Sequence, residues 1–143
     1  MNNIMAADAY KRNSVLNADQ KRLILICYNE AINSLKFGIE YYMKKDFEKK
    51  CNQFKRAKDF ISELQASLNI ETGDNIAQNL SNIYTFMLKH IMEGDARGNI
   101  KAIEDVIDML SELKSAWEQL PMTPEVQPVI APETQKTAYA YIG

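Results

Sequence analysis

The stretch LILICYNEAINSLKFGIEYYM, from Leu23 to Met43, decides the fold. Many of its apolar residues recur at alternating spacings of three and four, which places them on one side of an α-helix at about 100° per residue. No β-type alternation of apolar and polar residues competes with this pattern. The stretch therefore predicts a long helix with one stripe buried in a helical bundle. That core stripe consists of Leu25, Tyr28, Ile32, Leu35, Ile39 and Tyr42.

A second set of apolar residues lies on another arc of the same helix. Together the two sets cover roughly 260° of the helix, whereas a surface helix needs an apolar face of only about 100° or somewhat more. Three arrangements would cover the excess: a central position in the core, a homodimer contact, or an apolar helix of a partner protein. The second arc consists of Leu23, Ile26, Cys27, Phe37 and Tyr41.

Three more amphipathic segments follow the first helix, which is expected to run from about Ala18 to Lys44 or Lys45. They cover about 46–69, about 75–93 and 99–120. Asp46 and Asn99 are suitable N-caps, and the stretch 94–98, GDARG, predicts a break. Four helices of about 20 residues with short connections imply antiparallel neighbours. The predicted fold is therefore all-α, an antiparallel up-down four-helix bundle.

The two ends of the chain differ in composition from the bundle, which we expect to occupy residues 18–120. Residues 1–17 are polar with scattered apolar side chains, and we expect an N-terminal arm or cap with at most a short helix. Residues 121–143 carry Pro121, Pro124, Pro128 and Pro132, too many prolines for a helix. We therefore expect a disordered tail there.

Composition limits the class of protein and its compartment. A chain of 143 residues with a net charge of −2 fits one domain and shows no general attraction to nucleic acid. Its start lacks the apolar run of a signal peptide, and no segment approaches the roughly 18 to 20 apolar residues of a membrane span. Cys27 and Cys51 sit in apolar helical patterns and are expected to be buried and reduced. These features predict a soluble cytoplasmic protein without membrane insertion.

Few residues offer catalytic or metal chemistry. His90 is the single histidine, and the residue three before it is Met87, so the Glu-x-x-His pairs of di-iron bundles are missing. There is no Cys/His cluster for zinc and no phosphate-binding loop of the G-x-x-x-x-G-K type. We therefore expect a protein that is not an enzyme and that uses no metal or cofactor.

The strongest charge feature is the stretch 44–58, in which seven lysines and arginines face two acidic residues, a local excess of +5. Lys45, Lys49 and Arg56 fall opposite the Phe47/Phe54/Ile61 stripe on a helical wheel. Aromatic residues are not interleaved with these cations as they are in single-strand nucleic-acid sites. The pattern favours an ordinary solvated helix face.

Four segments, taken in order, resemble the FliS family of flagellar secretion chaperones. The match extends from Tyr10 to Trp117. Two features depart from the family pattern. Asn29-Glu30 replaces the usual Asp-Gly after the tyrosine of the first segment, and the proline-rich tail lies outside the shared pattern. The segments are LILICYNEAI at 23–32, AKDFISELQASLN at 57–69, GDNIAQNLSNIYTFM at 73–87 and VIDMLSELKSAW at 106–117.

The resemblance implies a cytoplasmic chaperone that binds the disordered C-terminal region of flagellin in apolar grooves, prevents premature polymerisation and assists export. It also implies that the N-terminal arm, with Tyr10, covers part of that surface in the free protein. Components of the flagellar export apparatus are further candidate partners. A self-associating structural or adaptor bundle is the alternative, and a monomer or a weak dimer is compatible with the sequence.

The candidate partner-binding residues come from three sources. Tyr10 is implied by the resemblance, and the five residues of the second arc by their excess apolar surface. Tyr84 widens the apolar stripe of the third segment, and Met109 and Trp117 of the fourth segment are open to either burial or partner contact. The full set is Tyr10, Leu23, Ile26, Cys27, Phe37, Tyr41, Tyr84, Met109 and Trp117.

Overall fold

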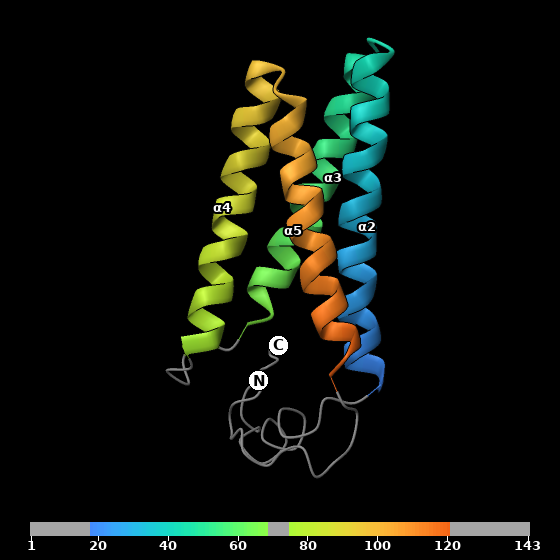
Figure 1. Cartoon of the computed structure of the whole chain (residues 1–143). Coiled ribbons are helices and arrows are strands. Elements are labelled where there is room, and N and C mark those ends of the chain that lie inside the picture. Colours follow the sequence, from blue (N-terminus) through green and yellow to red (C-terminus); the bar gives the residue numbers. More distant parts are fainter. Residues whose placement is uncertain (1–17, 69–74, 121–143) are drawn as a thin grey trace. The chain divides into compact units, whose positions relative to one another are not determined.

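Four α-helices account for almost all of the residues that the computed structural model describes, which are 18–68 and 75–120 (Figure 1). No strand occurs in these two ranges, so the predicted all-α class and four-helix bundle are confirmed. The predictions for the N-terminal arm and the proline-rich tail lie outside the described residues. The helices are α2 (Ala18–Met43), α3 (Phe47–Ala66), α4 (Asn75–Arg97) and α5 (Ile100–Glu118).

The chain divides into two compact units, and the second contains parts of all four helices. Its residues are 25–63 and 84–118. The contacts within it show that successive helices run antiparallel: Lys50 near the start of α3 binds Asp95 near the end of α4, with 2.6 Å between Nζ and Oδ1. Tyr28 in the first half of α2 bonds Trp117 at the end of α5, so the first and last helices are also antiparallel.

The core of the second unit contains most of the predicted stripe of α2. Tyr28, Ile32 and Leu35 are buried, whereas the side chains at the two ends of the predicted stripe are only half-buried. The other three helices supply large apolar side chains at spacings of three, four or seven, as their sequences predict. These are Phe54, Ile61, Tyr84, Met87, Ile91, Ile103, Val106 and Leu110.

The first unit comprises, among the described residues, 18–24, 64–68, 75–83 and 119–120. Gln65 links α3 to α4 there, because its Nε2 donates to the Ser81 carbonyl oxygen at 2.9 Å. Lys21 Nζ donates to the Leu120 carbonyl oxygen, also at 2.9 Å. The buried apolar residues of this unit include Ile24, Leu64 and Ala77.

Small residues on α2 allow α3 to approach closely. Ala31 and Ser34 are buried, and Phe54 of α3 packs directly against Gly38. A Cβ added at position 38 would overlap the Phe54 ring. The side of α2 that carries these small residues is therefore covered by α3.

Helices α2 and α4 end in the same type of C-terminal motif. Asp46 N donates to the Tyr41 carbonyl and Asn99 N to the Gly94 carbonyl, the six-to-one bonds of a Schellman motif. The left-handed position of this motif is filled by Gly98, at φ 64°, after α4 and by Lys45, at φ 63°, after α2. A lysine in this conformation carries a steric cost that glycine avoids.

Both predicted N-caps are confirmed. Lys49 N donates to Asp46 Oδ1 at 3.3 Å, and Ala102 N donates to Asn99 Oδ1 at 3.2 Å. The break predicted at 94–98 begins too early, because α4 continues to Arg97. Gly94 lies inside the helix, where a Cβ would be 2.9 Å from the Ala102 Cβ. This glycine therefore serves close packing of α5, not chain reversal.

Two predictions of burial are wrong. Cys51 is exposed and Cys27 only half-buried, although both were expected in the core. Phe47 continues the α3 stripe but is 51% exposed, because it occupies the first turn of the helix, where its nearest aromatic neighbour is the edge of Tyr42. Periodicity gives the direction of a side chain, but it does not show whether a neighbouring helix extends far enough to cover it.

Replacing Gly38 with alanine should lower the free energy of unfolding by about 1–3 kcal/mol, because the new methyl group overlaps the buried Phe54 ring. This loss outweighs the gain of about 1 kcal/mol that alanine brings to a helix interior. Chemical denaturation measures the difference. Asn29→Ala on the exposed side of α2 is the control and should change stability by less than about 0.5 kcal/mol. A Gly38→Ala variant as stable as the parent would contradict the close approach.

Lys45→Gly should raise the free energy of unfolding by about 0.5–1 kcal/mol, since glycine adopts positive φ without strain. The neighbouring Lys44→Gly is a matched control that removes the same charge from a position without positive φ. It should be destabilising by about 0.5–1 kcal/mol through backbone entropy. Thermal unfolding of the two variants must therefore shift in opposite directions, and equal shifts would exclude a strained turn.

Candidate partner-binding surface

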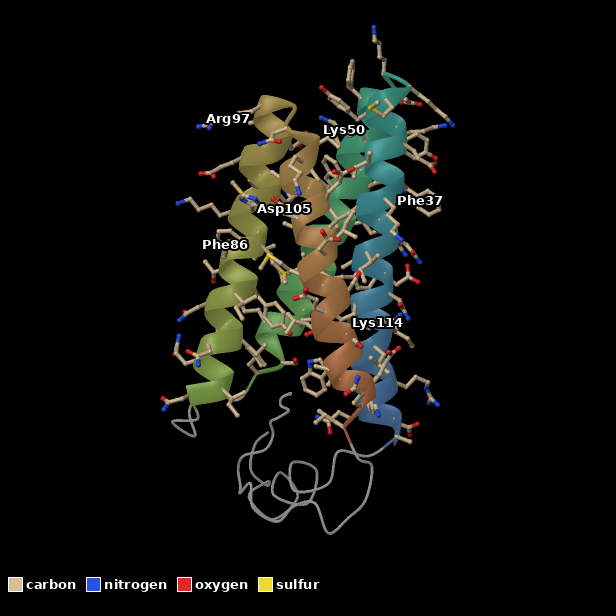
Figure 2. The ribbon with its side chains drawn as sticks, viewed as in Figure 1. Phe37, Lys50, Phe86, Arg97, Asp105 and Lys114 are labelled. Carbon is tan, nitrogen blue, oxygen red and sulfur yellow. The ribbon has the colours of Figure 1, made fainter. Side chains whose placement is uncertain are left out.

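The outer face of α2 carries accessible apolar side chains in the second unit. Ile26 is 43% and Phe37 49% exposed. Because they are eleven residues apart, helical geometry places them within roughly 20° of each other around the axis. Figure 2 shows Phe37 projecting outward from α2. Tyr41 lies half-buried one turn further on, and we call Ile26, Phe37 and Tyr41 the α2 surface.

The second arc of the sequence is thus divided between two environments. Ser34, which interrupts it, is buried, Gly38 meets the Phe54 ring of α3, and Cys27 on the same side is half-buried. The larger side chains Ile26 and Phe37 lie beyond the edge of α3 and remain accessible. A neighbouring helix of the same chain therefore covers the small residues and leaves the large ones uncovered.

Arg56 of α3 borders the α2 surface and connects the two helices. Its NH2 donates to Glu30 Oε1 at 2.8 Å and its NH1 to Ser34 Oγ at 2.9 Å. The guanidinium carbon also lies 5.1 Å from the centre of the Phe60 ring. A planar guanidinium is suited to such combined hydrogen bonding and stacking. The sequence placed Arg56 on a solvated face but gave no indication of these partners.

Other cations of the basic stretch are also engaged. Lys50 pairs with Asp95, and this hydrogen bond raises the pKa of the Lys50 ammonium. Lys55 pairs with Asp59 at 3.0 Å, and Lys49 Nζ lies 5.6 Å from the centre of the Tyr41 ring. The solvated-face prediction therefore needs refinement, because several of the seven cations have partners in the same chain.

Three further predicted residues differ in accessibility. Leu23, in the first unit, is 62% exposed. Cys27 is half-buried, and burial, followed by the nearby Glu63 carboxylate, raises the pKa of its thiol. The thiol therefore stays protonated at neutral pH and is a poor nucleophile. Met109 of α5 is half-buried, whereas Tyr10 lies outside the described residues.

Tyr84 and Trp117 lie in the core. The hydroxyl groups of Tyr84 and Tyr28 form a buried hydrogen bond, and Trp117, whose indole N–H can only donate, bonds the Tyr28 hydroxyl. The exposed fractions of Tyr84 and Trp117 are 1% and 6%. Their role in partner binding remains a prediction, and in the free chain they hold α2, α4 and α5 together from inside the second unit.

A smaller aromatic surface lies on α4. Phe86 is 49% exposed and stacks on His90, with 4.9 Å between ring centres. His90 Nε2 is 4.0 Å from Asp105 Oδ2, and Lys101 Nζ is 2.8 Å from the other oxygen of that carboxylate. Figure 2 shows Phe86 on α4 and Asp105 on α5. The single histidine thus lies at the surface against an aromatic ring and an ion-paired carboxylate.

An open groove of about 400 Å³ lies between α2 and α5. Its charged residues are two lysines and two acidic residues. The groove therefore favours neither anionic nor cationic ligands. It is lined by Lys36, Ile39, Lys101, Glu104, Ile107 and Asp108.

Two classes of site are missing from the part of the chain that the structure describes. There, no three histidine, cysteine, aspartate or glutamate side chains gather closely enough to hold a metal ion. Within the same residues, no helix is long and apolar enough to cross a membrane.

Comparison with known proteins decides the family. The flagellar protein FliS family matches residues 1–124. The chain belongs to the FliS family. This family includes flagellar secretion chaperones, and the resemblance found in the four segments is thereby confirmed.

Several FliS relatives match most of the chain, and each is named flagellar secretion chaperone FliS. The protein from Vibrio cholerae is 31% identical over 129 residues, which cover 87% of this chain and 93% of the relative. That from Salmonella typhimurium is 30% identical over 108 residues, 75% of this chain and 80% of the relative. That from Escherichia coli is 22% identical over 114 residues, 79% of this chain and 84% of the relative.

The buried pair Tyr28 and Tyr84 makes the stability of this FliS chain vary with pH in the alkaline range. Burial raises the pKa of Tyr28 and of Tyr84 well above the ordinary value of about 10. Above pH 10 the unfolded chain therefore loses protons that the folded chain retains, and the free energy of unfolding falls as pH rises. Each tyrosine contributes up to about 1.4 kcal/mol per pH unit in this range.

Denaturant titrations measure this slope between about pH 9 and pH 11.5, a range that includes the ordinary tyrosine pKa of about 10. The double variant Tyr28→Phe/Tyr84→Phe should show a shallower decline, whatever its stability at pH 7. Tyr41→Phe, at a less buried position, is the matched control and should retain most of the parent slope. Identical slopes in the parent and the double variant would exclude retained protons on these two hydroxyls.

Proposed function

We propose that the chain is a cytoplasmic export chaperone that binds the C-terminal segment of flagellin on the α2 surface. Membership in the FliS family gives the general role in flagellar secretion. The observation that carries the specific proposal is the accessible pair Ile26 and Phe37 on one line of an otherwise well-packed helix. Exposed apolar patches of this kind mark interaction sites.

The spacing of the α2 surface favours a helical ligand. Apolar side chains at i, i+3 and i+4 on an amphipathic helix can contact a row of apolar residues along another helix. Arg56 and Lys49 border this row, but Arg56 already binds Glu30 and Ser34, and Lys49 lies near Asp46. The surface therefore suits a segment with an apolar stripe.

Binding of a disordered segment offers a physical route to both protection and release. Occupying the apolar stripe of flagellin removes that stripe from contacts with other flagellin molecules. The segment must become ordered as it binds, and this entropy cost lowers the net affinity relative to the area buried. The complex is then stable enough to prevent assembly and weak enough to transfer its cargo to the export apparatus.

The remaining predicted residues fit this proposal in different ways. Leu23 is an accessible apolar side chain of the first unit, Cys27 is half-buried beside the α2 surface, and Tyr84 and Trp117 lie in the core of the second unit. We propose that the segment with Tyr10 covers part of the surface in the free chain, as the family resemblance implies.

Substituting the α2 surface should weaken binding of a peptide from the flagellin C-terminus. Ile26→Glu/Phe37→Glu introduces two carboxylates where apolar contacts form, and we expect the dissociation constant to rise at least tenfold, about 1.4 kcal/mol or more. Calorimetry measures the affinity, and circular dichroism measures the helix gained by the peptide. Both target residues are exposed, so the fold should be unchanged.

Phe86→Glu is the control, because Phe86 has the same exposed fraction as Phe37 but lies on α4. It should leave the affinity within about twofold of the parent, a difference below about 0.5 kcal/mol. If the parent protein neither binds the peptide nor changes its helicity, flagellin is not the ligand. If Phe86→Glu weakens binding as much as the α2 substitutions, the ligand uses another face.

A further inference from the structure

The turn between α2 and α3 exposes two large apolar side chains at one end of the second unit. Met43, the last residue of α2, is 69% exposed, and Phe47, the first residue of α3, is 51% exposed. Lys44 and Lys45 lie between them in the sequence, and both are exposed. Exposed apolar side chains that cluster in this way mark interaction sites. We call these four residues the α2–α3 tip.

The backbone of the α2–α3 tip is held in one conformation by hydrogen bonds on both sides of the turn. Asp46 N donates to the Tyr41 carbonyl at 2.9 Å, and Lys45 N donates to the Tyr42 carbonyl, also at 2.9 Å. Asp46 Oδ1 accepts from Lys49 N in the first turn of α3. The side chains of the tip therefore project from a fixed frame, which lowers the entropy cost of binding a surface.

Lysine at position 45 is unfavourable for the turn itself. Its φ of 63° is the left-handed conformation that glycine adopts without strain, and the corresponding residue after α4 is Gly98. Residues in strained conformations cluster at functional sites, where the side chain has a role that offsets the cost. The strain at Lys45 therefore points to a function of its ammonium group outside folding.

Positive charge is concentrated at this end of the second unit. Gly98, between α4 and α5, lies against the Tyr42 hydroxyl of α2, so the two turns are neighbours. Residues 43–50 and 95–100 together carry five lysines and arginines and three acidic residues, an excess of +2 in a chain with a net charge of −2. Figure 1 shows both turns at the same end, and Figure 2 shows Arg97 there.

Three of these five cations are available to a partner. Lys50 is engaged by Asp95 at 2.6 Å, and Lys49 lies 3.8 Å from Asp46. Of the acidic residues at this end, Glu48 alone forms no ion pair with another described residue. The cations that are exposed and likewise unpaired within the described ranges are Lys44, Lys45 and Arg97.

We propose that the α2–α3 tip docks on a bilayer that contains anionic phospholipids. Met43 and Phe47 enter the headgroup region, where their apolar surface is removed from water. The ammonium groups of Lys44 and Lys45 bind lipid phosphates, and Arg97 adds a third cation beside them. The contact is peripheral, because only side chains of the turn reach the lipid.

A bilayer fits this surface better than an acidic protein does. Met43 and Phe47 stand on a turn that closes two helices, so they project outward and would need a matching pocket in a rigid partner. Lipid headgroups instead rearrange around projecting side chains. Lysine stems can lie along the apolar groups while their ammonium groups reach the phosphates. The combination of projecting apolar side chains with adjacent lysines therefore favours lipid.

Co-sedimentation of the full chain with vesicles tests the docking. Phosphatidylcholine vesicles with about one-third phosphatidylglycerol should bind the chain at least about tenfold more strongly than phosphatidylcholine alone. Raising the salt concentration from about 0.05 M to about 0.5 M should weaken this binding at least about threefold through screening. Equal binding to both kinds of vesicle, or binding to neither, overturns the proposal. No flagellin is present, so the result is independent of the proposed function.

Two variants separate the apolar from the charged contribution. Met43→Ser/Phe47→Ser keeps every charge and should lower the partition coefficient on anionic vesicles at least about tenfold. Lys44→Gln/Lys45→Gln keeps the apolar pair and should also lower it at least about tenfold. Circular dichroism checks that both variants remain folded.

Phe86→Ser/Lys89→Gln on α4 is the matched control, because it removes one exposed aromatic ring and one exposed lysine away from the tip. Its partition coefficient should stay within about threefold of the parent value. A loss as large as that of the tip variants would mean that the chain adheres to vesicles without a defined site, contrary to the proposal.

Lys45→Gly distinguishes docking from an effect on folding. The substitution removes strain and should stabilise the chain, but it also removes a cation from the tip, so the partition coefficient should fall about fivefold. Stability and vesicle binding then change in opposite directions. Undiminished binding by this variant would contradict the role assigned to the Lys45 ammonium.

Soluble polyglutamate tests an acidic protein surface as the partner. Weaker binding to this polymer than to anionic vesicles, together with the loss in Met43→Ser/Phe47→Ser, supports docking on lipid. If the parent binds the polymer as tightly as the vesicles and the serine variant binds vesicles like the parent, charge alone accounts for the binding and the bilayer proposal is wrong.

Discussion

The close contact between Phe54 of α3 and Gly38 of α2 governs what the rest of this surface can do. Because position 38 lacks a Cβ, the aromatic ring reaches the backbone of α2, and α3 lies over the small residues Ala31 and Ser34. Arg56 is thereby brought within hydrogen-bonding distance of Ser34 and Glu30. The large side chains Ile26 and Phe37 are left at the edge of the contact. A bulkier residue at position 38 would move α3 outward and alter this distribution.

Side-chain periodicity predicts the helices and most of the core. Tyr28, Ile32 and Leu35 are buried where the three-four pattern places them, and Asp46 and Asn99 cap the helices that follow. This success has a simple cause: helix formation and amphipathic burial depend on residues close together in the sequence. Fold class and helix order could therefore be predicted from local patterns.

The features that could not be predicted depend on residues far apart in the sequence. Gly94 signals a break by composition, but in the structure it provides room for Ala102 of the next helix. Cys51 and Phe47 continue an apolar stripe, yet both are exposed because no neighbouring side chain covers them fully. The same limit applies to the candidate surface. The wide apolar arc of α2 predicts more apolar surface than one neighbouring helix covers, but it does not predict which part of the arc α3 covers.

The single tryptophan of the chain lies in the core, and its indole bonds Tyr28. Its fluorescence therefore reports on one buried environment, without contributions from tryptophans elsewhere. Ligands on the outer face of α2 approach a different side of that helix from the one that meets Trp117. The emission should thus follow loss of the helical core while responding little to occupancy of the surface, so folding and binding can be followed as separate optical signals in the same sample.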